Sequence, residues 1–273
     1  MHLRNRGLAA ASELDRSPTC ALRAAGAVRM TSNVTRRILS LISPVSAAGY
    51  KKTRLGNGGD GGYVLLDNFV DSSCCLSIGI GGDVSFDAAL ADRGYDIFQY
   101  DHTVSGPPTP HDRFKFAQIG LAPRGQASET LHDLDQIIAD HNIRAYQRPI
   151  LKIDIEDAEW DVLLNLEPTS IEIFDQICLE FHNLNRLSDP DKARKIERAF
   201  RFLTQTHAPI HIHGNNWGKF YIVNGIPIPE VIELTYASKK NYVMTPCHEI
   251  FPGEHDTPNK PDESDLFLGH FQF

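Results

Sequence analysis

Short β-rich segments alternate with helical segments along most of this chain, and no other feature of the sequence restricts its fold as much. Apolar segments that favour strands lie at 74–80, 95–101, 113–121, 149–155, 176–182 and 208–214. Segments with the apolar spacing of amphipathic helices lie at 83–94, 128–142, 158–166 and 189–206. Because strands that alternate with helices usually pair in parallel, the pattern predicts an α/β fold with one doubly wound sheet.

The segment at 219–236 departs from this alternation. It contains two β-rich runs separated by an Asn-Gly pair and prolines, which favour a tight turn between antiparallel strands. We therefore expect a mostly parallel sheet with an antiparallel hairpin at one edge. Neither an internal repeat nor a linker interrupts residues 50–240, so these residues are expected to form one catalytic domain.

The two ends of the chain differ from this domain in composition. Residues 1–49 hold seven Arg, no Lys and two acids, and are predicted to form a disordered or helical leader. The alternatives are an organelle transit peptide and a true start at Met30. Residues 241–273 are rich in Pro and acids, and we expect an extension that packs on the domain or trails from it.

Composition and charge argue against two classes of function. The formal net charge of −8 gives no sign of a basic surface for nucleic acid, and no apolar run is long enough to span a bilayer. The five cysteines, at 20, 74, 75, 178 and 247, form no C-x-x-C pair, which argues against a zinc site. Reduced, mostly buried thiols are typical of a cytoplasmic protein, and that is the predicted location.

A glycine-rich turn follows the first strand of the predicted sheet. In "SIGIGGD" (77–83), the glycines let the backbone approach a ligand closely. The dinucleotide pattern G-x-G-x-x-G is incomplete, because Val84 occupies its last position. S-adenosylmethionine has no phosphate and tolerates such a turn, and Asp101, one strand later, could accept hydrogen bonds from both ribose hydroxyls. The turn therefore indicates an adenosine ligand, with a purely structural glycine turn as the alternative.

Polar pairs end three successive predicted strands. Because side chains two positions apart on a strand face the same way, three pairs are expected to share a face: Asp154 with Glu156, Glu180 with His182, and His211 with His213. A sheet interior disfavours such groups, so they predict a polar pocket beside the glycine turn. The alternatives are that Asp157, Glu159 and Asp161 are first-turn helix acids, that either His of the H-x-H pair is a core residue, and that Glu180 only orients a neighbour.

The same segments resemble a known enzyme family. "LKIDIEDAEWDVL" (151–163) is similar to the K-I-D-V-E-G-A-E signature of FkbM-type S-adenosylmethionine-dependent methyltransferases, with Asp157 in place of the usual Gly. "RLGNGGDGGYVL" (54–65), "SIGIGGDVSFDAALADRG", "LEFHNL" and "HIHGNNWG" resemble the related methyltransferase-like protein 24 group. The resemblance runs from about Arg54 to Tyr236.

This resemblance implies a class I methyltransferase, with a seven-stranded sheet in the order 3-2-1-4-5-7-6 and S-adenosyl-L-methionine over the ends of the first two strands. Gly79 and Gly81 would line the methionine part, Asp101 the ribose, and Asp154 the transferred methyl group. "DGGY" (60–63) would close over the cofactor, or else be a glycine turn that leads into a strand. The expected cofactor-binding residues are Gly79, Gly81, Asp83, Asp101, Asp60, Gly61 and Tyr63.

The predicted reaction is O-methylation of a hydroxyl on a small molecule or saccharide. His182 would be the general base, because an imidazole titrates near the working pH, and Asp154 would orient the acceptor or the base. The other residues predicted to complete the catalytic pocket are Glu180, His211, His213 and Asn215. In a variant of this mechanism, Asp154, Glu180 and the histidines bind a divalent metal that acidifies the hydroxyl.

Two further classes of function use the same residues. A metal-dependent hydrolase would use the Asp/Glu/His cluster without S-adenosylmethionine, and a non-catalytic sensor would bind an adenosine ligand without transferring a methyl group. The motifs specify neither the acceptor nor the oligomeric state.

Overall fold

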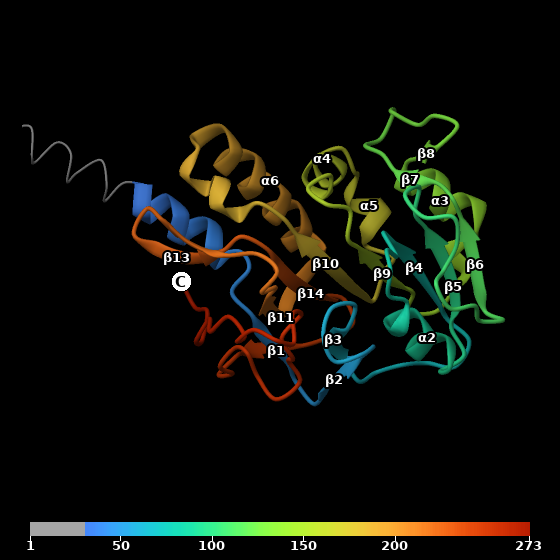
Figure 1. Ribbon diagram of the computed structural model, residues 1–273, viewed down its shortest axis with the longest axis horizontal. Helices are drawn as coiled ribbons and strands as arrows, with labels where there is room; N and C mark the ends of the chain where they lie inside the picture. The colour runs from blue at the N-terminus through green and yellow to red at the C-terminus, as the bar shows by residue number, and fades with distance from the viewer. Residues whose placement is uncertain (1–30) are drawn as a thin grey trace, which may run out of the picture.

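The computed structural model describes residues 31–273, and its centre is a seven-stranded sheet in the order β11-β14-β10-β9-β4-β5-β6 (Figure 1). The strands are β4 (Cys74–Ile78), β5 (Asp96–Tyr100), β6 (Phe114–Ala117), β9 (Ile150–Ile153), β10 (Gln176–Phe181), β11 (His207–Gly214) and β14 (Ile232–Ser238). Neighbours from β6 to β10 pair in parallel, whereas β14 runs antiparallel to both β10 and β11. The predicted mixed α/β fold with a mostly parallel seven-stranded sheet is therefore confirmed, and the sheet is compatible with a Rossmann-like fold.

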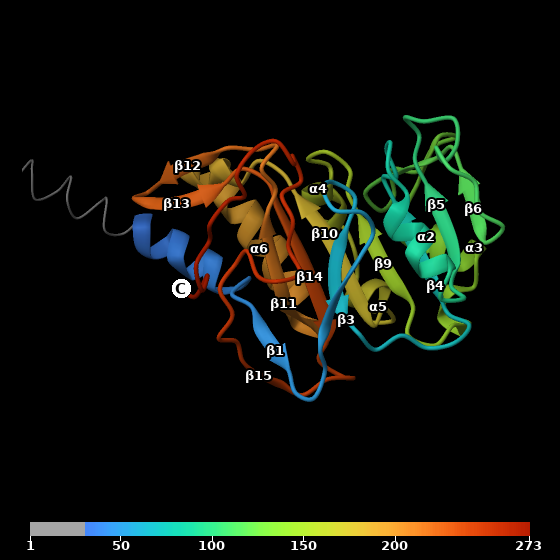
Figure 2. The same ribbon diagram turned by 60° about the horizontal axis from the view of Figure 1, so that its bottom comes forward.

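The predicted edge hairpin is wrong. β12 (Phe220–Val223) and β13 (Ile226–Pro229) form a separate two-stranded sheet that stands apart from the main one (Figure 2). Asn224 and Gly225 make the turn with positive φ angles, as a two-residue hairpin requires. β14 follows and inserts between β10 and β11. All seven of its residues are buried, and backbone groups on both sides of the strand form hydrogen bonds with a neighbouring strand. Numbered in chain order from the β6 edge, the sheet is 3-2-1-4-5-7-6, the order that the resemblance implies.

Several helices pack against one face of the sheet (Figure 1). They are α3 (Leu134–Asp140), α4 (Glu159–Leu164), α5 (Pro168–Ile171), α6 (Pro190–Thr206), the 3-10 turns η1 (Ile143–Ala145) and η2 (Leu184–Ser188), and a helical segment at 31–40. The opposite face carries α2 (Ser85–Ala91) and the antiparallel pair β2 (Lys52–Leu55) and β3 (Tyr63–Leu66). The site described below lies between these layers, at the carboxyl ends of the strands.

Two predicted elements are shorter in the structure than in the sequence pattern. The helix predicted at 128–142 begins only at Leu134. Asp133 is its N-cap, and the Asp133 side chain accepts a hydrogen bond from the Gln136 N–H. Leu131, which fits the helical spacing, instead lies in β8 (Leu131–His132), which pairs with β7 (Gly120–Leu121). β7 is in turn the end of the single strand predicted at 113–121.

Both ends of the described chain pack on the domain. Ile38 and Leu39 from the helical segment are fully buried in the main core, so the described part of the predicted leader is helical up to residue 40 and folded. The rest of that prediction, residues 1–30, lies outside the described residues. β1 (Val45–Ala47) pairs with β15 (Met244–Pro246), and Phe251 and Phe271 enter the core. Of the two arrangements expected for 241–273, the structure has the packed one.

The thiols and the helices bear on the predicted location. Cys74, Cys75, Cys178 and Cys247 are free and buried, whereas Cys20 lies outside the described residues. Across residues 31–273, no helix combines the length and the apolar character that crossing a membrane requires. The cytoplasmic location stays a prediction.

Candidate functional site

A cavity of about 380 Å³ opens where β4, β5 and β9 end. Its walls include Gly79 and Gly81 from the glycine turn, Asp101 from the end of β5, and Asp154 and Glu156 from the segment after β9. The structure therefore brings the predicted glycine turn, the predicted ribose acid and the first two acids of the cluster to one hollow.

Gly79 shapes this hollow through backbone geometry. Its φ is +77°, and a Cβ added there would lie 1.6 Å from the Asp154 carbonyl oxygen. The glycine is therefore required where the turn after β4 crosses the chain after β9. Gly81 has a φ of +50°, but a Cβ there would meet open space, so its backbone faces an accessible volume.

Asp101 is an ionised acid held by backbone and side-chain donors. Its Oδ2 accepts from the Gly81 N–H at 3.0 Å, and its Oδ1 accepts from the Thr103 N–H and hydroxyl at 2.7 and 2.6 Å. Burial alone would raise the pKa of Asp101, but these hydrogen bonds outweigh it and lower the pKa. A carboxylate has about four acceptor sites, so Oδ2 keeps the capacity to accept from a ligand hydroxyl.

A second cavity, of about 240 Å³, adjoins the first and shares Gly81, Asp154 and Glu156 with it. The predicted cofactor-binding residues that line it are Asp60, Gly61, Tyr63, Gly81 and Asp83. Asp83 accepts from the Ser85 N–H at 2.6 Å and from Asn57 at 3.3 Å, so it ties the segment just before "DGGY" to the start of α2. Burial raises the pKa of Tyr63 well above its usual value, so its phenol stays neutral.

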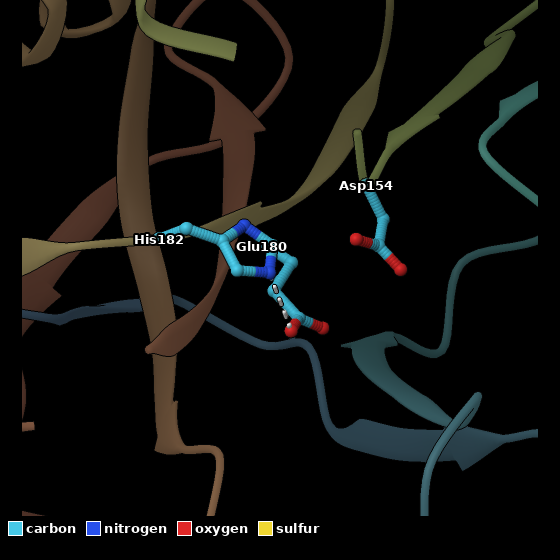
Figure 3. A group of neighbouring side chains, drawn as sticks. All are labelled: Asp154, Glu180 and His182. Carbon is cyan, nitrogen blue, oxygen red and sulfur yellow. Dashed lines mark ion pairs between the residues drawn. The ribbon is translucent and has the colours of Figure 1, made fainter. Parts of the chain in front are cut away.

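Asp154, Glu180 and His182 meet beside these cavities (Figure 3). One ligand atom from each lies within 4.8 Å of the other two. The Nε2 atom of His182 lies 3.4 Å from Glu180 Oε1 and 3.4 Å from Glu156 Oε2. β9 ends at Ile153, and Glu156 has a φ of +54°, so it reaches His182 from an exposed turn rather than along a strand.

Glu159 is a site residue that the sequence argument missed. Glu159 does lie in the first turn of α4, as one of the alternatives had it, but its side chain is fully buried and its Oε1 accepts from the His182 backbone N–H at 2.7 Å. The same oxygen lies 3.1 Å from His182 Nδ1. Glu159 shares the buried face of α4 with Val162 and Leu163, three and four residues later, and this helical spacing could have revealed it.

The other two acids of the segment lie away from this contact. Asp157 pairs with Arg186 at 2.6 Å and Asp161 with Lys195 at 2.7 Å. The φ of Asp157 is +84°, a left-handed backbone that favours glycine, which is the residue usual at this position of the signature.

The surroundings of His182 argue against its predicted role as general base. Burial lowers the pKa of His182, but hydrogen bonds to Glu159 and Glu180 outweigh burial and raise the pKa to about 11. An imidazole that already carries both protons cannot accept a third. Burial, together with the nearby charge of Asp154, raises the pKa of Glu180.

Lys152 is the second residue that the sequence argument missed. It is 7% exposed, donates a hydrogen bond from Nζ to the Gly79 carbonyl oxygen, and lies 3.6 Å from Asp154 Oδ2. It therefore ties the glycine turn to Asp154 and partly balances that charge. A lysine inside the otherwise apolar strand "ILKI" was the available signal.

The residues predicted on β11 do not join the cluster as expected. His211 lines a separate cavity of about 630 Å³ and lies 2.7 Å from Asp256, and burial lowers its pKa. His213 lies between Glu233 and Asp265, at 3.1 and 3.0 Å. Because β14 separates β11 from β10, these histidines stand two strand spacings, about 10 Å, from Glu180.

Asn215 does reach the cluster, from the turn after β11. Its Nδ2 donates to Glu180 Oε1 at 3.0 Å. Glu233 on β14 also faces Glu180 in register, and with Asp60 these two acids form a second group whose ligand atoms lie within 4.8 Å of one another. Asn259, from the C-terminal extension, donates to both Asp60 and Glu233.

Comparison with known proteins gives distant structural neighbours but no family. Neither a family model nor a curated protein matches the chain. Among solved structures, the chain is similar to one from Streptococcus thermophilus described as a "Putative hemolysin". The sequences are 9% identical, the match covers 74% of this chain and 75% of that one, and the TM-score is 0.31. Such a likeness assigns neither a family nor a function, so the resemblance to FkbM-type methyltransferases stays a prediction.

Proposed function

We propose that this chain is an S-adenosyl-L-methionine-dependent methyltransferase that O-methylates a hydroxyl of a small molecule or a saccharide. The observation that carries the proposal is the cavity that joins the glycine turn and the buried carboxylate of Asp101 to Asp154. The chain passes from β4 to β5 on one side of β4 and later adds β9 on its other side, so the strand order reverses at β4, where the cavity opens. Open α/β sheets bind ligands at such a reversal of strand order. The strand order supports the class I methyltransferase fold.

The residues of this cavity fit the cofactor. Asp101 would accept hydrogen bonds from the ribose hydroxyls, and the peptide groups at Gly79 and Gly81 would face the methionine part. Tyr100 and Leu121 offer apolar surface for the adenine. A volume of about 380 Å³ lies within the range of small-molecule sites.

Bound S-adenosyl-L-methionine would supply a methyl group on a positively charged sulfur. The chain would hold the acceptor hydroxyl in line with that group, and Asp154, at the end of β9, is placed to orient it. As the new carbon–oxygen bond forms and the sulfur–carbon bond breaks, the hydroxyl proton has to leave. Because His182 keeps its proton in the chain without a bound ion, Asp154 and Glu180 are the groups proposed to accept a hydrogen bond from that hydroxyl.

Calorimetry with S-adenosylhomocysteine tests the cofactor assignment. We expect one binding site per chain and at least tenfold weaker binding for Asp101→Asn, because hydrogen bonds to a charged group are worth about 1.5–3 kcal/mol. Asp71→Asn changes an exposed acid outside the cavities and should leave the affinity unchanged. A wild-type chain that binds neither S-adenosylmethionine nor S-adenosylhomocysteine would refute the proposal, and hydrolysis of esters or phosphates by that chain would favour the hydrolase alternative. Binding without transfer to any hydroxyl in a panel of acceptors would favour the sensor.

A further inference from the structure

The acids beside His182 lack a matching number of cations. Asp154, Glu156 and Glu180 gather around the imidazole, and Lys152 is the lysine that pairs with Asp154. Glu233 faces Glu180 from the neighbouring strand. Glu180 and Glu233 are buried, and like charges repel each other strongly there, so a bound cation would stabilise the arrangement.

Glu159 determines which nitrogen of His182 faces these acids. The fully buried carboxylate holds both the backbone N–H of His182 and Nδ1, the latter at 3.1 Å. Nε2 therefore turns towards Glu180 and Glu156, 3.4 Å from an oxygen of each. A carboxylate behind one ring nitrogen is the usual support of an imidazole whose other nitrogen binds a metal.

Glu180 presents an oxygen without a partner on the same side. Its Oε1 accepts from Asn215 and faces His182, whereas no hydrogen bond or ion pair within residues 31–273 involves Oε2. The residue is only 6% exposed, and Figure 3 shows its second oxygen on the side of Asp154. Because Glu180 as a residue is largely buried, this oxygen is available to a hydrogen-bond donor or a cation from the cavity side.

We propose that Asp154, Glu180 and His182 bind one divalent cation, which takes the place of the proton on His182 Nε2 as that proton leaves to solvent. Two carboxylate oxygens and one imidazole nitrogen are a mixed ligand set that suits Mn²⁺, since oxygen ligands favour hard ions and imidazole favours transition metals. The role of the ion, though not its binding, rests on the proposed methyltransferase function. It would bind the acceptor hydroxyl beside the cofactor cavity and ease loss of the proton to solvent while the methyl group moves from sulfur to oxygen.

The second acidic group is a weaker candidate for the ion. Glu233 already bonds Asn259 through Oε1 and His213 through Oε2, and Asp60 bonds Asn259 through Oδ1. These oxygens have partners within the chain, whereas Glu180 Oε2 has none among the described residues. Because Glu180 belongs to both groups, His182 and Asp60 are the residues that distinguish the two locations.

Titration of the metal-free chain with Mn²⁺, followed by calorimetry and electron paramagnetic resonance, tests this proposal. We expect one Mn²⁺ per chain, and an affinity at least tenfold lower for Glu180→Gln and for His182→Asn. Asp161→Asn is the matched control, because Asp161 lies on α4 beside the site but is 61% exposed and pairs with Lys195. If Glu180→Gln fails to fold, as judged by circular dichroism, Asp154→Asn and His182→Asn decide the question.

Each outcome bears on one claim. A wild-type chain that binds neither Mn²⁺ nor Mg²⁺ overturns the metal site. Loss of Mn²⁺ in Asp60→Asn, with full binding in His182→Asn, also overturns it, because the ion would then lie in the other group. S-adenosylhomocysteine binding is measured on the same samples, so a chain that binds Mn²⁺ but no cofactor keeps the metal site and refutes the methyltransferase.

Discussion

The three glycines of the turn after β4 allow a graded test of the site's geometry. Replacing Gly79 with Ala places a Cβ 1.6 Å from the Asp154 carbonyl oxygen and forces a non-glycine residue to a φ of +77°. The left-handed backbone costs about 1–2 kcal/mol. Relief of the overlap requires backbone movement, which in packed interiors costs about 1–3 kcal/mol. We expect the free energy of unfolding to fall by about 3 kcal/mol.

The neighbouring glycines are the controls. Gly81→Ala meets open space but has a φ of +50°, so it should cost about 1–2 kcal/mol. Gly82→Ala meets open space and has no positive φ, so its free energy of unfolding should stay within about 0.5 kcal/mol of the wild type. Urea denaturation at constant pH measures all three. Equal stability of the Gly79 and Gly82 variants would refute the argument that the two chain segments cross at Gly79.

Three further predictions concern a buried histidine, a helix cap and the support of His182. Burial lowers the pKa of His207 to about 4, so between pH 7 and 4.5 the unfolded chain takes up a proton that the folded chain does not bind. Over this range the free energy of unfolding should fall by about 2–3 kcal/mol more in the wild type than in His207→Gln. Urea denaturation at both pH values measures this, and an equal fall in the two proteins would contradict it. Asp133→Ala should cost about 1 kcal/mol in the same assay, whereas Asp133→Asn keeps a cap and should cost only a few tenths; equal losses would argue against the cap. Glu159→Gln should weaken Mn²⁺ binding about 10- to 100-fold while S-adenosylhomocysteine affinity is kept, and unchanged Mn²⁺ affinity would show that Glu159 does not position His182.

The sequence predicted well those features that depend on local periodicity. The two-residue period of β10 placed Glu180 and His182 together at the strand end, and the apolar segments located the other strands of the parallel part of the sheet. The cap at Asp189 and the following Pro190 likewise marked the start of α6.

Features that depend on distant pairing were beyond this reasoning. The position of β14 follows from contacts with β10 and β11, which local pattern does not encode, and it keeps His211 and His213 away from Asp154. Asn259 joins the site through a segment about 80 residues from Glu180 in sequence, with no motif to indicate it. Long-range pairing of this kind is a tertiary property that propensity does not record.

Diffraction from crystals grown with S-adenosylhomocysteine and Mn²⁺, using the anomalous signal of manganese, would examine ligand and ion together. Our account places the ribose hydroxyls within hydrogen-bond distance of Asp101, and the manganese peak between Asp154, Glu180 and His182. Nucleoside density away from the ends of β4 and β5, or a manganese peak that touches none of those three side chains, would contradict it.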